Sequence, residues 1–351
     1  MSEMLQFLSF VFLLLASSCF PVLGQQQQKQ GTLHRRTYSY VGQKYTSDGD
    51  LTIAADQMYV EHLTPAEVTQ PLPLLLIHGM GMTGTNFLNT PDGRLGWADY
   101  FLSQGYELYI VDQPARARSP WQPSQSHFTA AVLHTQWPGN GSMGDPTFDK
   151  FFASIVPSLN SSTEEAQKIN DAGSLLLDQI GPVIVITHSQ AGPFGWDLAN
   201  SRPNQVKAIV ALEPAGPPFI NAIFPPFTPA RIFGVTDIPI AYDPPISSPS
   251  ELVPAVVNQI QGVTCFEQKA PARKLVNLLH IPVLTVTSES SYHAQYDNCT
   301  VNYLRQAGVN VEHIRLENVG IHGNAHMFFM EKNGIQVANE VIQPWIAKIG
   351  A

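Results

Sequence analysis

Residues 183–192 read Val-Ile-Val-Ile-Thr-His-Ser-Gln-Ala-Gly. The first four are apolar and β-branched, which is typical of a strand buried on both faces of a parallel sheet. A helix-compatible segment, residues 190–200, follows directly, so Ser189 lies on the turn between strand and helix. Such a turn projects a serine hydroxyl from the carboxyl edge of the sheet and leaves the next backbone N–H free for an oxyanion. The stretch predicts a nucleophile elbow, with Ser189 as the candidate catalytic nucleophile.

Apolar strands alternate with helical segments along most of the chain. Besides the elbow, we expect strands at residues 73–77, 106–111, 206–212, 281–287 and 309–316, and helices at residues 97–104, 163–179, 299–307 and 327–349. Residues 37–45 and 51–62 alternate around a Ser-Asp-Gly-Asp turn, which predicts two antiparallel strands at the leading edge of the sheet. The predicted fold class is therefore α/β, with a mostly parallel, doubly wound sheet in one domain over residues 37–351.

Two segments interrupt this alternation, at about residues 116–160 and 214–275. The first carries scattered proline, glycine and aromatic residues, and we expect a mostly irregular insertion that lies over the sheet. The second holds twelve prolines between residues 214 and 274. That composition resists regular structure, yet it is too apolar for a disordered linker. We interpret the second insertion as a lid; the alternative is a surface excursion without a role in catalysis.

The chain begins with the features of a secretory leader. Residues 5–15 form an apolar run that is followed by small residues and a glutamine tract. This pattern predicts a signal peptide over residues 1–24 and a polar segment over residues 25–36, and the run is short for a membrane span. Glu3 and the lack of a basic residue before the run make an uncleaved anchor the alternative. We expect a secreted protein, with no stable membrane association once the leader is cleaved.

Cysteines and sequons bear on the same compartment. Cys19 lies in the leader, so the mature chain keeps Cys265 and Cys299. An even pair in an oxidising compartment favours one disulfide, and two unpaired buried thiols are the alternative. Three Asn-x-Ser/Thr sequons agree with secretion and are candidate glycosylation sites. They begin at Asn140, Asn160 and Asn298.

Charge and histidine spacing bear on several other classes of function. The formal net charge of the 351 residues is -9, without a cluster of basic residues. We therefore expect neither nucleic acid nor an anionic membrane surface as a partner. His322 and His326 have i, i+4 spacing, but no HExxH motif or Cys/His framework accompanies them. We expect no metal and no cofactor.

A catalytic serine needs an imidazole base and a carboxylate that orients the imidazole. In the chain order Ser, acid, His, the base follows the last strand, where the loop offers His322 and His326. We choose His326, because it would begin the terminal helix, whose apolar body would anchor the ring. His322 lies in a glycine-flanked turn and is the alternative.

Two glutamates are candidates for the acid. Glu289 follows the strand after the second insertion, and Glu213 ends the strand after the elbow in a proline-rich turn. The geometry expected from the sequence does not separate them. For the oxyanion hole, the backbone N–H of Gln190 follows from the elbow itself. The turn at residues 78–81, His-Gly-Met-Gly, offers a second donor, which we assign to Met80.

Six short blocks carry a more specific signal. They are residues 77–84 (IHGMGMTG), 90–101 (TPDGRLGWADYF), 111–114 (VDQP), 187–190 (THSQ), 212–214 (LEP) and 323–327 (GNAHM). With these blocks, residues 70–345 resemble a branch of the α/β-hydrolase superfamily that contains secreted bacterial serine esterases and fungal relatives. The resemblance implies an α/β-hydrolase fold with Ser189 and His326 in the catalytic triad. It also implies Glu213, rather than Glu289, as the acid.

The chain departs from the branch or the superfamily at two places. Thr187 and Ala191 stand where a Gly-x-Ser-x-Gly elbow has glycines, although the branch shares the threonine. Some bacterial members have adjacent cysteines in the oxyanion loop, where this chain has Met80 and Gly81, which excludes a vicinal disulfide.

These observations lead to one interpretation and two alternatives. We interpret the chain as a secreted serine hydrolase that cleaves a carboxylic ester or lactone of a small, moderately apolar molecule through an acyl-enzyme. Similar fungal proteins include hydrolases encoded beside polyketide-peptide synthases of the fusarin and cytochalasan type, so a tailoring hydrolase or cyclase of secondary metabolism is the first alternative. The second is a hydrolase fold that only binds, which the full set of Ser, Glu and His argues against.

Overall fold

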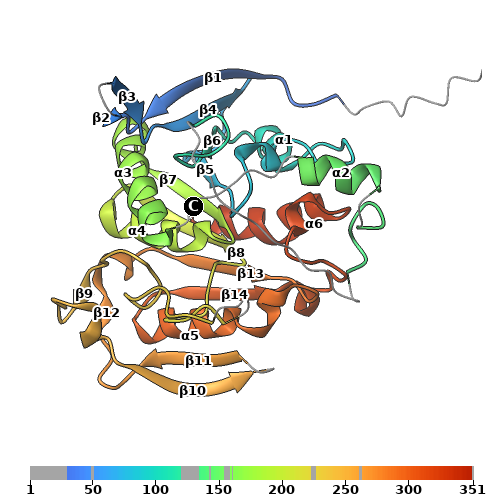
Figure 1. The fold of residues 1–351 in the computed structure, drawn as a ribbon. Coiled ribbons are helices and arrows are strands. Elements are labelled where there is room, and N and C mark those ends of the chain that lie inside the picture. Colours follow the sequence, from blue (N-terminus) through green and yellow to red (C-terminus); the bar gives the residue numbers. More distant parts are fainter. Residues whose placement is uncertain are drawn as a thin grey trace, which may run out of the picture. The chain divides into compact units, whose positions relative to one another are not determined.

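An eight-stranded sheet lies at the centre of the unit formed by residues 31–351 (Figure 1). The computed structural model describes residues 30–48, 51–119, 134–141, 144–153, 159, 161–222, 227–260 and 263–349. In spatial order, the strands of the sheet are β1 (His34–Val41), β4 (Met58–Pro65), β6 (Leu108–Asp112), β5 (Leu74–Ile77), β7 (Val183–His188), β8 (Val206–Leu212), β13 (Val283–Thr287) and β14 (Val311–Arg315). The six strands β6, β5, β7, β8, β13 and β14 pair in parallel. At one edge, β4 pairs antiparallel with both β6 and β1. The predicted mostly parallel, doubly wound sheet is confirmed.

Helices cover both faces of the sheet. They are α1 (Trp97–Ser103), α2 (Pro146–Ala153), α3 (Ser162–Ile180), α4 (Ala191–Ser201), α5 (Asp297–Gln306), α6 (Gly334–Val337) and α7 (Gln343–Ile349). Side chains of β7 alternate between two cores, since successive residues of a strand point to opposite faces. Val183 and Val185 pack with α3, α4 and α5, and Ile184 and Ile186 pack with α1, α6 and α7. Burial on both faces explains why the first four residues of β7 are all apolar.

The register aligns three strand ends at the carboxyl edge. His188 of β7 pairs with Leu212 of β8, which pairs in turn with Val286 of β13. The next residues along β7 and β8 are Ser189 and Glu213, so both lie just beyond the same edge. Ligands of open parallel sheets bind at this edge.

The leading strands differ from the prediction. Instead of two long strands, the chain forms β1 and β4 in the main sheet and a separate hairpin of β2 (Lys44–Asp48) and β3 (Leu51–Ala55). Gly42 and Asp56 separate the two pairs and both have positive φ, 83° and 65°. Backbone in this conformation cannot continue a strand, so each predicted strand is broken there.

The second insertion contains regular structure that its prolines concealed. A hairpin of β10 (Pro254–Ile260) and β11 (Val263–Gln268) forms within it, as does a short pair of β9 (Tyr242–Asp243) and β12 (Lys274–Leu275). Only one proline stands within the two hairpin strands, at the first position of β10, where a missing N–H is tolerated. The expectation of an insertion without regular structure was therefore wrong for residues 254–268.

The terminal helix begins later than predicted. Residues 328–330 form a single 3-10 turn, and the continuous helical segment runs from Gly334 through α6, a π-helical turn (Ala338–Ile342) and α7. The Arg94 guanidinium stabilises the non-helical segment before it, because it donates to the backbone oxygens of Met330, Glu331 and Lys332 at 3.0–3.3 Å. A helix would use these oxygens for its own amides. His326 therefore precedes the helix instead of beginning it.

Other parts of the prediction fall partly or wholly outside the described residues. The predicted leader lies outside them, as does much of the first insertion, of which the structure describes α2 and short flanking segments. Within the described part of the chain, no helix combines the length and the apolar character needed to cross a membrane.

Candidate active site

Ser189 lies on the sharp turn between β7 and α4. Its φ is +56°, in the left-handed region that non-glycine residues rarely occupy. The turn is fixed on both sides, because the Ser189 amide donates to Leu212 O at 3.0 Å and Ser189 O accepts from Gly192 N and Ala215 N at 2.9 and 2.8 Å. The hydroxyl is thus presented at the carboxyl edge of the sheet.

Helix α4 accommodates the unusual threonine before the elbow. Thr187 is fully buried, and a Cβ added to Gly195 would lie 3.0 Å from Thr187 Cγ2. Gly195, one turn into α4, thus leaves room for the Thr187 side chain. An elbow with glycine at position 187 would not need this room.

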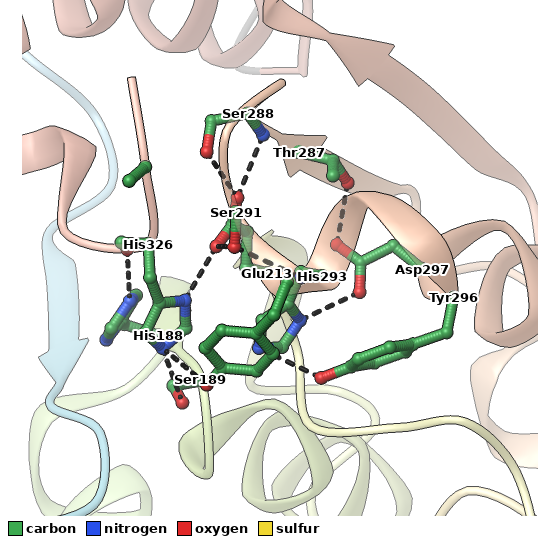
Figure 2. A network of polar contacts seen from close by, with 12 residues as sticks. His188, Ser189, Glu213, Thr287, Ser288, Ser291, His293, Tyr296, Asp297 and His326 are labelled. Carbon is green, nitrogen blue, oxygen red and sulfur yellow. Dashed lines mark hydrogen bonds and ion pairs between the residues drawn. The ribbon is translucent and has the colours of Figure 1, made fainter. Parts of the chain in front are cut away.

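The structure brings Ser189, His326 and Glu213 into one hydrogen-bonded chain (Figure 2). His326 Nε2 lies 2.9 Å from Ser189 Oγ, and His326 Nδ1 lies 2.6 Å from Glu213 Oε2. An ionised carboxylate only accepts, so Nδ1 carries the ring hydrogen and Nε2 is free to accept from the serine hydroxyl. This is the tautomer that a general base needs.

Four donors surround the Glu213 carboxylate, which is completely buried. Besides His326, they are the Ser288 amide at 2.8 Å, the Ser288 hydroxyl at 2.7 Å and the Ser291 hydroxyl at 2.6 Å. Burial alone would raise the pKa of Glu213, but the hydrogen bond from His326 and the neighbouring charges and donors outweigh burial and lower the pKa to about 2. Glu213 is therefore ionised at neutral pH.

Two further imidazoles flank the His326 ring. His188 Nε2 donates to His326 O at 2.9 Å, with ring centroids 4.4 Å apart. The ring of His293 stacks on His326 at 4.6 Å with an interplanar angle of 6° (Figure 2). Burial lowers the pKa of His188 well below its ordinary value and that of His293 to about 4. Both rings are neutral at neutral pH, so neither opposes a positive charge on His326.

Asp297 and Tyr296 complete the polar contacts of His293. Asp297 Oδ1 lies 2.9 Å from Nδ1, and the Tyr296 hydroxyl lies 3.0 Å from Nε2. Burial, together with the charge of Glu213, raises the pKa of Asp297 well above its ordinary value. The environment thus shifts the pKa values of the two buried carboxyls in opposite directions, that of Glu213 downward and that of Asp297 upward.

Tyr292 contacts both Ser189 and His326 directly. Its hydroxyl lies 3.2 Å from His326 Nε2 and forms a hydrogen bond with Ser189. Burial raises the pKa of Tyr292, so the phenol stays protonated and can donate.

The alternative acid and the alternative base pair with each other. Glu289 Oε2 lies 3.1 Å from His322 Nδ1, and Glu289 Oε1 accepts from Gly323 N at 2.6 Å. The His322 side chain is 63% exposed, whereas His326 is buried. Neither Glu289 nor His322 hydrogen-bonds to Ser189, His326 or Glu213 in the described part of the chain.

One group of described side chains has a spacing that suits a metal ion. Ligand atoms of Glu213, His293 and His326 lie within 4.8 Å of one another. These atoms already bond to one another, to the serines around Glu213, or to Asp297 and Tyr296. A metal ion would have to displace these hydrogen bonds.

The two predicted oxyanion donors lie on the 78–81 turn and on the residue after Ser189. A Cβ added to Gly79 would lie 3.0 Å from Ser189 Cβ, so only glycine allows the 78–81 turn to approach the elbow this closely. In the described part of the chain, neither the Met80 nor the Gln190 amide donates to a protein acceptor. Both N–H groups are thus free for a substrate oxygen.

Comparison with known proteins shows the family of the chain. The profile of the alpha/beta hydrolase family matches residues 74–340. The chain belongs to the alpha/beta hydrolase family. The fold class expected from the sequence is confirmed.

Individual relatives of this alpha/beta hydrolase agree with the assignment. A fungal protein named "Probable secreted lipase phiG" is 42% identical over 373 residues, covering 98% of this chain and 100% of the relative. A solved structure described as a novel bacterial esterase superimposes with a TM-score of 0.63 at 23% identity, covering 92% of this chain and 98% of that one. At that level of identity, the second likeness concerns the fold alone.

A disulfide ties the second insertion of the hydrolase to α5. Cys265 of β11 and Cys299 of α5 are joined, with their Cα atoms 5.1 Å apart. Of the predicted glycosylation sites, Asn140 is exposed, Asn298 is half-buried in α5 beside the disulfide, and Asn160 lies outside the described residues.

The low-pH limb of the activity profile should report on His326. Burial lowers the pKa of His326, although the hydrogen bond that His326 donates to Glu213 opposes this shift. Hydrolysis needs the neutral ring, so kcat/KM should be constant at high pH and fall as the pH drops through the pKa of His326. We expect a midpoint below pH 6.5, measured with an ester that has no ionisable group; a midpoint above 7 would contradict this electrostatic description.

Several residues of the site were missed from the sequence. Ser288, Ser291, Tyr292 and His293 all follow β13, and they contact Glu213 or His326. The signal was present, because polar residues after a parallel strand lie at the ligand edge of a sheet.

Proposed function

We propose that the protein is a serine hydrolase that cleaves carboxylic esters or lactones through an acyl-enzyme. The observation that carries the proposal is the hydrogen-bonded chain from Ser189 Oγ through His326 to Glu213, with separations of 2.9 and 2.6 Å. A serine hydroxyl needs such a base to become nucleophilic at neutral pH. The relative named a secreted lipase supports an ester as substrate.

In the proposed mechanism, Ser189 Oγ attacks the ester carbonyl while its proton passes to His326 Nε2. Glu213 stabilises the imidazolium that forms, and the amides of Met80 and Gln190 hold the oxyanion of the tetrahedral intermediate. The intermediate collapses, and the leaving alcohol takes the proton from Nε2. Water then attacks the acyl-enzyme by the same route, which releases the acid and restores Ser189.

The second insertion supports an apolar substrate. It exposes Phe227 and Ile232, with 62% and 45% of their surface accessible. With the insertion over the site, as we propose, these side chains would suit an acyl chain or an aromatic alcohol better than a charged substrate. We infer that residues 214–275 act as a lid over the site.

Secretion is part of the same proposal. The leader pattern of residues 1–24 and the relative named a secreted lipase support it. In an oxidising compartment, the Cys265–Cys299 disulfide persists and the exposed Asn140 accepts a glycan.

The second candidate, a tailoring hydrolase or cyclase, uses the same acyl-enzyme. An internal hydroxyl or amine of the substrate would then replace water as the acceptor. Products of a hydroxy-acyl ester distinguish the two, because the hydrolase releases a free acid and the cyclase releases a ring.

A panel of esters tests the proposal. We expect the protein to hydrolyse p-nitrophenyl acetate, butyrate, octanoate and palmitate, with kcat/KM higher for at least one of the longer chains than for acetate. The matched control is the corresponding p-nitroanilide series, which an esterase cleaves much more slowly. No turnover of any ester by the folded protein would contradict the proposal.

A further inference from the structure

A buried arginine lies behind the two predicted oxyanion donors. Arg116 follows β6, and its side chain has 0% of its surface exposed. The guanidinium extends toward the 78–81 turn and the start of α4. A fully buried cation is costly unless each contact is well placed, so its partners indicate what it does.

The first partner is the peptide that carries one oxyanion donor. Arg116 Nη1 donates to Gly79 O at 3.0 Å. Gly79 O belongs to the same peptide unit as Met80 N, and the C=O and N–H of a trans peptide point in opposite directions. The hydrogen bond from the charged guanidinium to Gly79 O therefore fixes the direction of the Met80 N–H and increases the partial positive charge on that N–H.

His78 contributes a second donor to the same oxygen. The Gln113 amide donates to His78 Nε2 at 3.1 Å, so Nε2 is an acceptor and the hydrogen of the neutral ring is on Nδ1. His78 Nδ1 then donates to Gly79 O at 2.9 Å, and Met82 N approaches the same oxygen at 3.3 Å. Among these three donors, only Arg116 is charged at neutral pH, because burial lowers the pKa of His78 to about 4.

The second partner is the residue that carries the other oxyanion donor. Arg116 Nη2 donates to Gln190 Oε1 at 2.7 Å and to Glu165 Oε1 at 2.5 Å. Gln190 Nε2 in turn donates to Glu165 Oε2. These contacts form a closed ring of three side chains that holds Gln190, so one planar guanidinium reaches both sides of the oxyanion hole.

We propose that Arg116 is the positioning residue of the oxyanion hole, which it organises through the Gly79 carbonyl and the Gln190 side chain. This inference rests on the proposed function. It assigns Arg116 a role in stabilising the transition state, beyond the ion pair with Glu165. Because the oxyanion is absent from the bound ester and develops only as the tetrahedral intermediate forms, loss of Arg116 should affect kcat and leave KM almost unchanged.

The test compares Arg116 with its neighbour Arg118. Arg118 is a matched control, because it lies on the same loop after β6 as Arg116. Its guanidinium pairs with Glu61 and Asp112 and does not contact the 78–81 turn. We expect Arg116→Met to lower kcat by about 10- to 100-fold, because displacing a preorganised donor is costly but less so than removing it. Arg118→Met should change kcat by less than about 3-fold once matched for folded protein, since no contact of Arg118 reaches the hole.

Inhibitors add a readout that a purely structural role would not move. An alkyl trifluoromethyl ketone forms a tetrahedral adduct with an oxyanion, whereas the analogous ether only occupies the site. Arg116→Met should raise Ki for the ketone by the factor lost in kcat and leave Ki for the ether unchanged. Equal kcat and ketone affinity in the wild type and Arg116→Met would overturn the inference, as would an equal loss in Arg118→Met.

A second variant keeps the test decisive if Arg116→Met does not fold. Lysine retains the charge but lacks the planar fork, so Arg116→Lys cannot hold Gly79 O and Gln190 Oε1 together. We expect about a 10-fold loss of kcat with an unchanged KM, and full kcat would overturn the inference. An inactive wild-type protein would instead contradict the proposed function itself, so the two failures are distinguishable.

Discussion

Replacing Ser189 with alanine should lower kcat/KM for p-nitrophenyl butyrate by about 10⁴- to 10⁶-fold, the scale seen when a triad nucleophile is removed. The residual rate would come from the oxyanion hole and from substrate binding. Alanine also has a Cβ, so the variant keeps the same positive-φ turn and should unfold at nearly the same temperature as the wild type.

The matched control for this variant is Ser201→Ala at the far end of α4. Ser201 Oγ donates to Asn170 Oδ1 at 2.8 Å, away from the catalytic edge. This control should retain kcat/KM within about 3-fold, as surface substitutions away from special features usually do. Near-wild-type activity of Ser189→Ala, with product formation proportional to enzyme, would contradict the assignment of the nucleophile.

Glu213→Gln should lower kcat by about 10³- to 10⁴-fold, because an amide in this position can favour the wrong tautomer of the imidazole. With an NH₂ group facing Nδ1, the ring hydrogen moves to Nε2, and His326 can no longer accept the proton of Ser189. Circular dichroism and thermal unfolding should accompany the kinetics, since Glu213 also accepts from Ser288 and Ser291.

Glu289→Gln is the control with matched chemistry. Glu289 contacts the exposed His322 and the Gly323 amide, so we expect kcat within about 3-fold of the wild type. Equal losses in the two glutamine variants would refute Glu213 as the acid that orients His326.

The two glutamates show where local sequence reasoning stops. Both follow strands at the carboxyl edge, so position along the chain cannot separate them, and family resemblance alone favoured Glu213. In space, each glutamate has its own histidine, and only the pair of Glu213 and His326 contacts Ser189. Which glutamate pairs with which histidine depends on the directions of their side chains, and the order of residues in the sequence does not contain these directions.

The sequence predicted the fold better than it predicted the long-range contacts that hold the site. Apolar runs with both faces buried predicted the parallel strands, because burial leaves a strong signal in composition. The late start of the last helix was missed, since it depends on Arg94 reaching three carbonyls more than 230 residues away in sequence. Arg116 was missed for the same reason, because its contacts join the residues after β6 to two distant turns.

Covalent modification by a fluorophosphonate tests the proposed mechanism through the residue that is labelled. Native protein should incorporate one phosphonyl group, and peptide mass mapping should place it on Ser189. Ser189→Ala should not be labelled, and heat-denatured wild type should not be labelled either, because labelling needs His326 within reach of the hydroxyl. Modification of a different residue, or none on a native protein that hydrolyses esters, would contradict a mechanism based on Ser189.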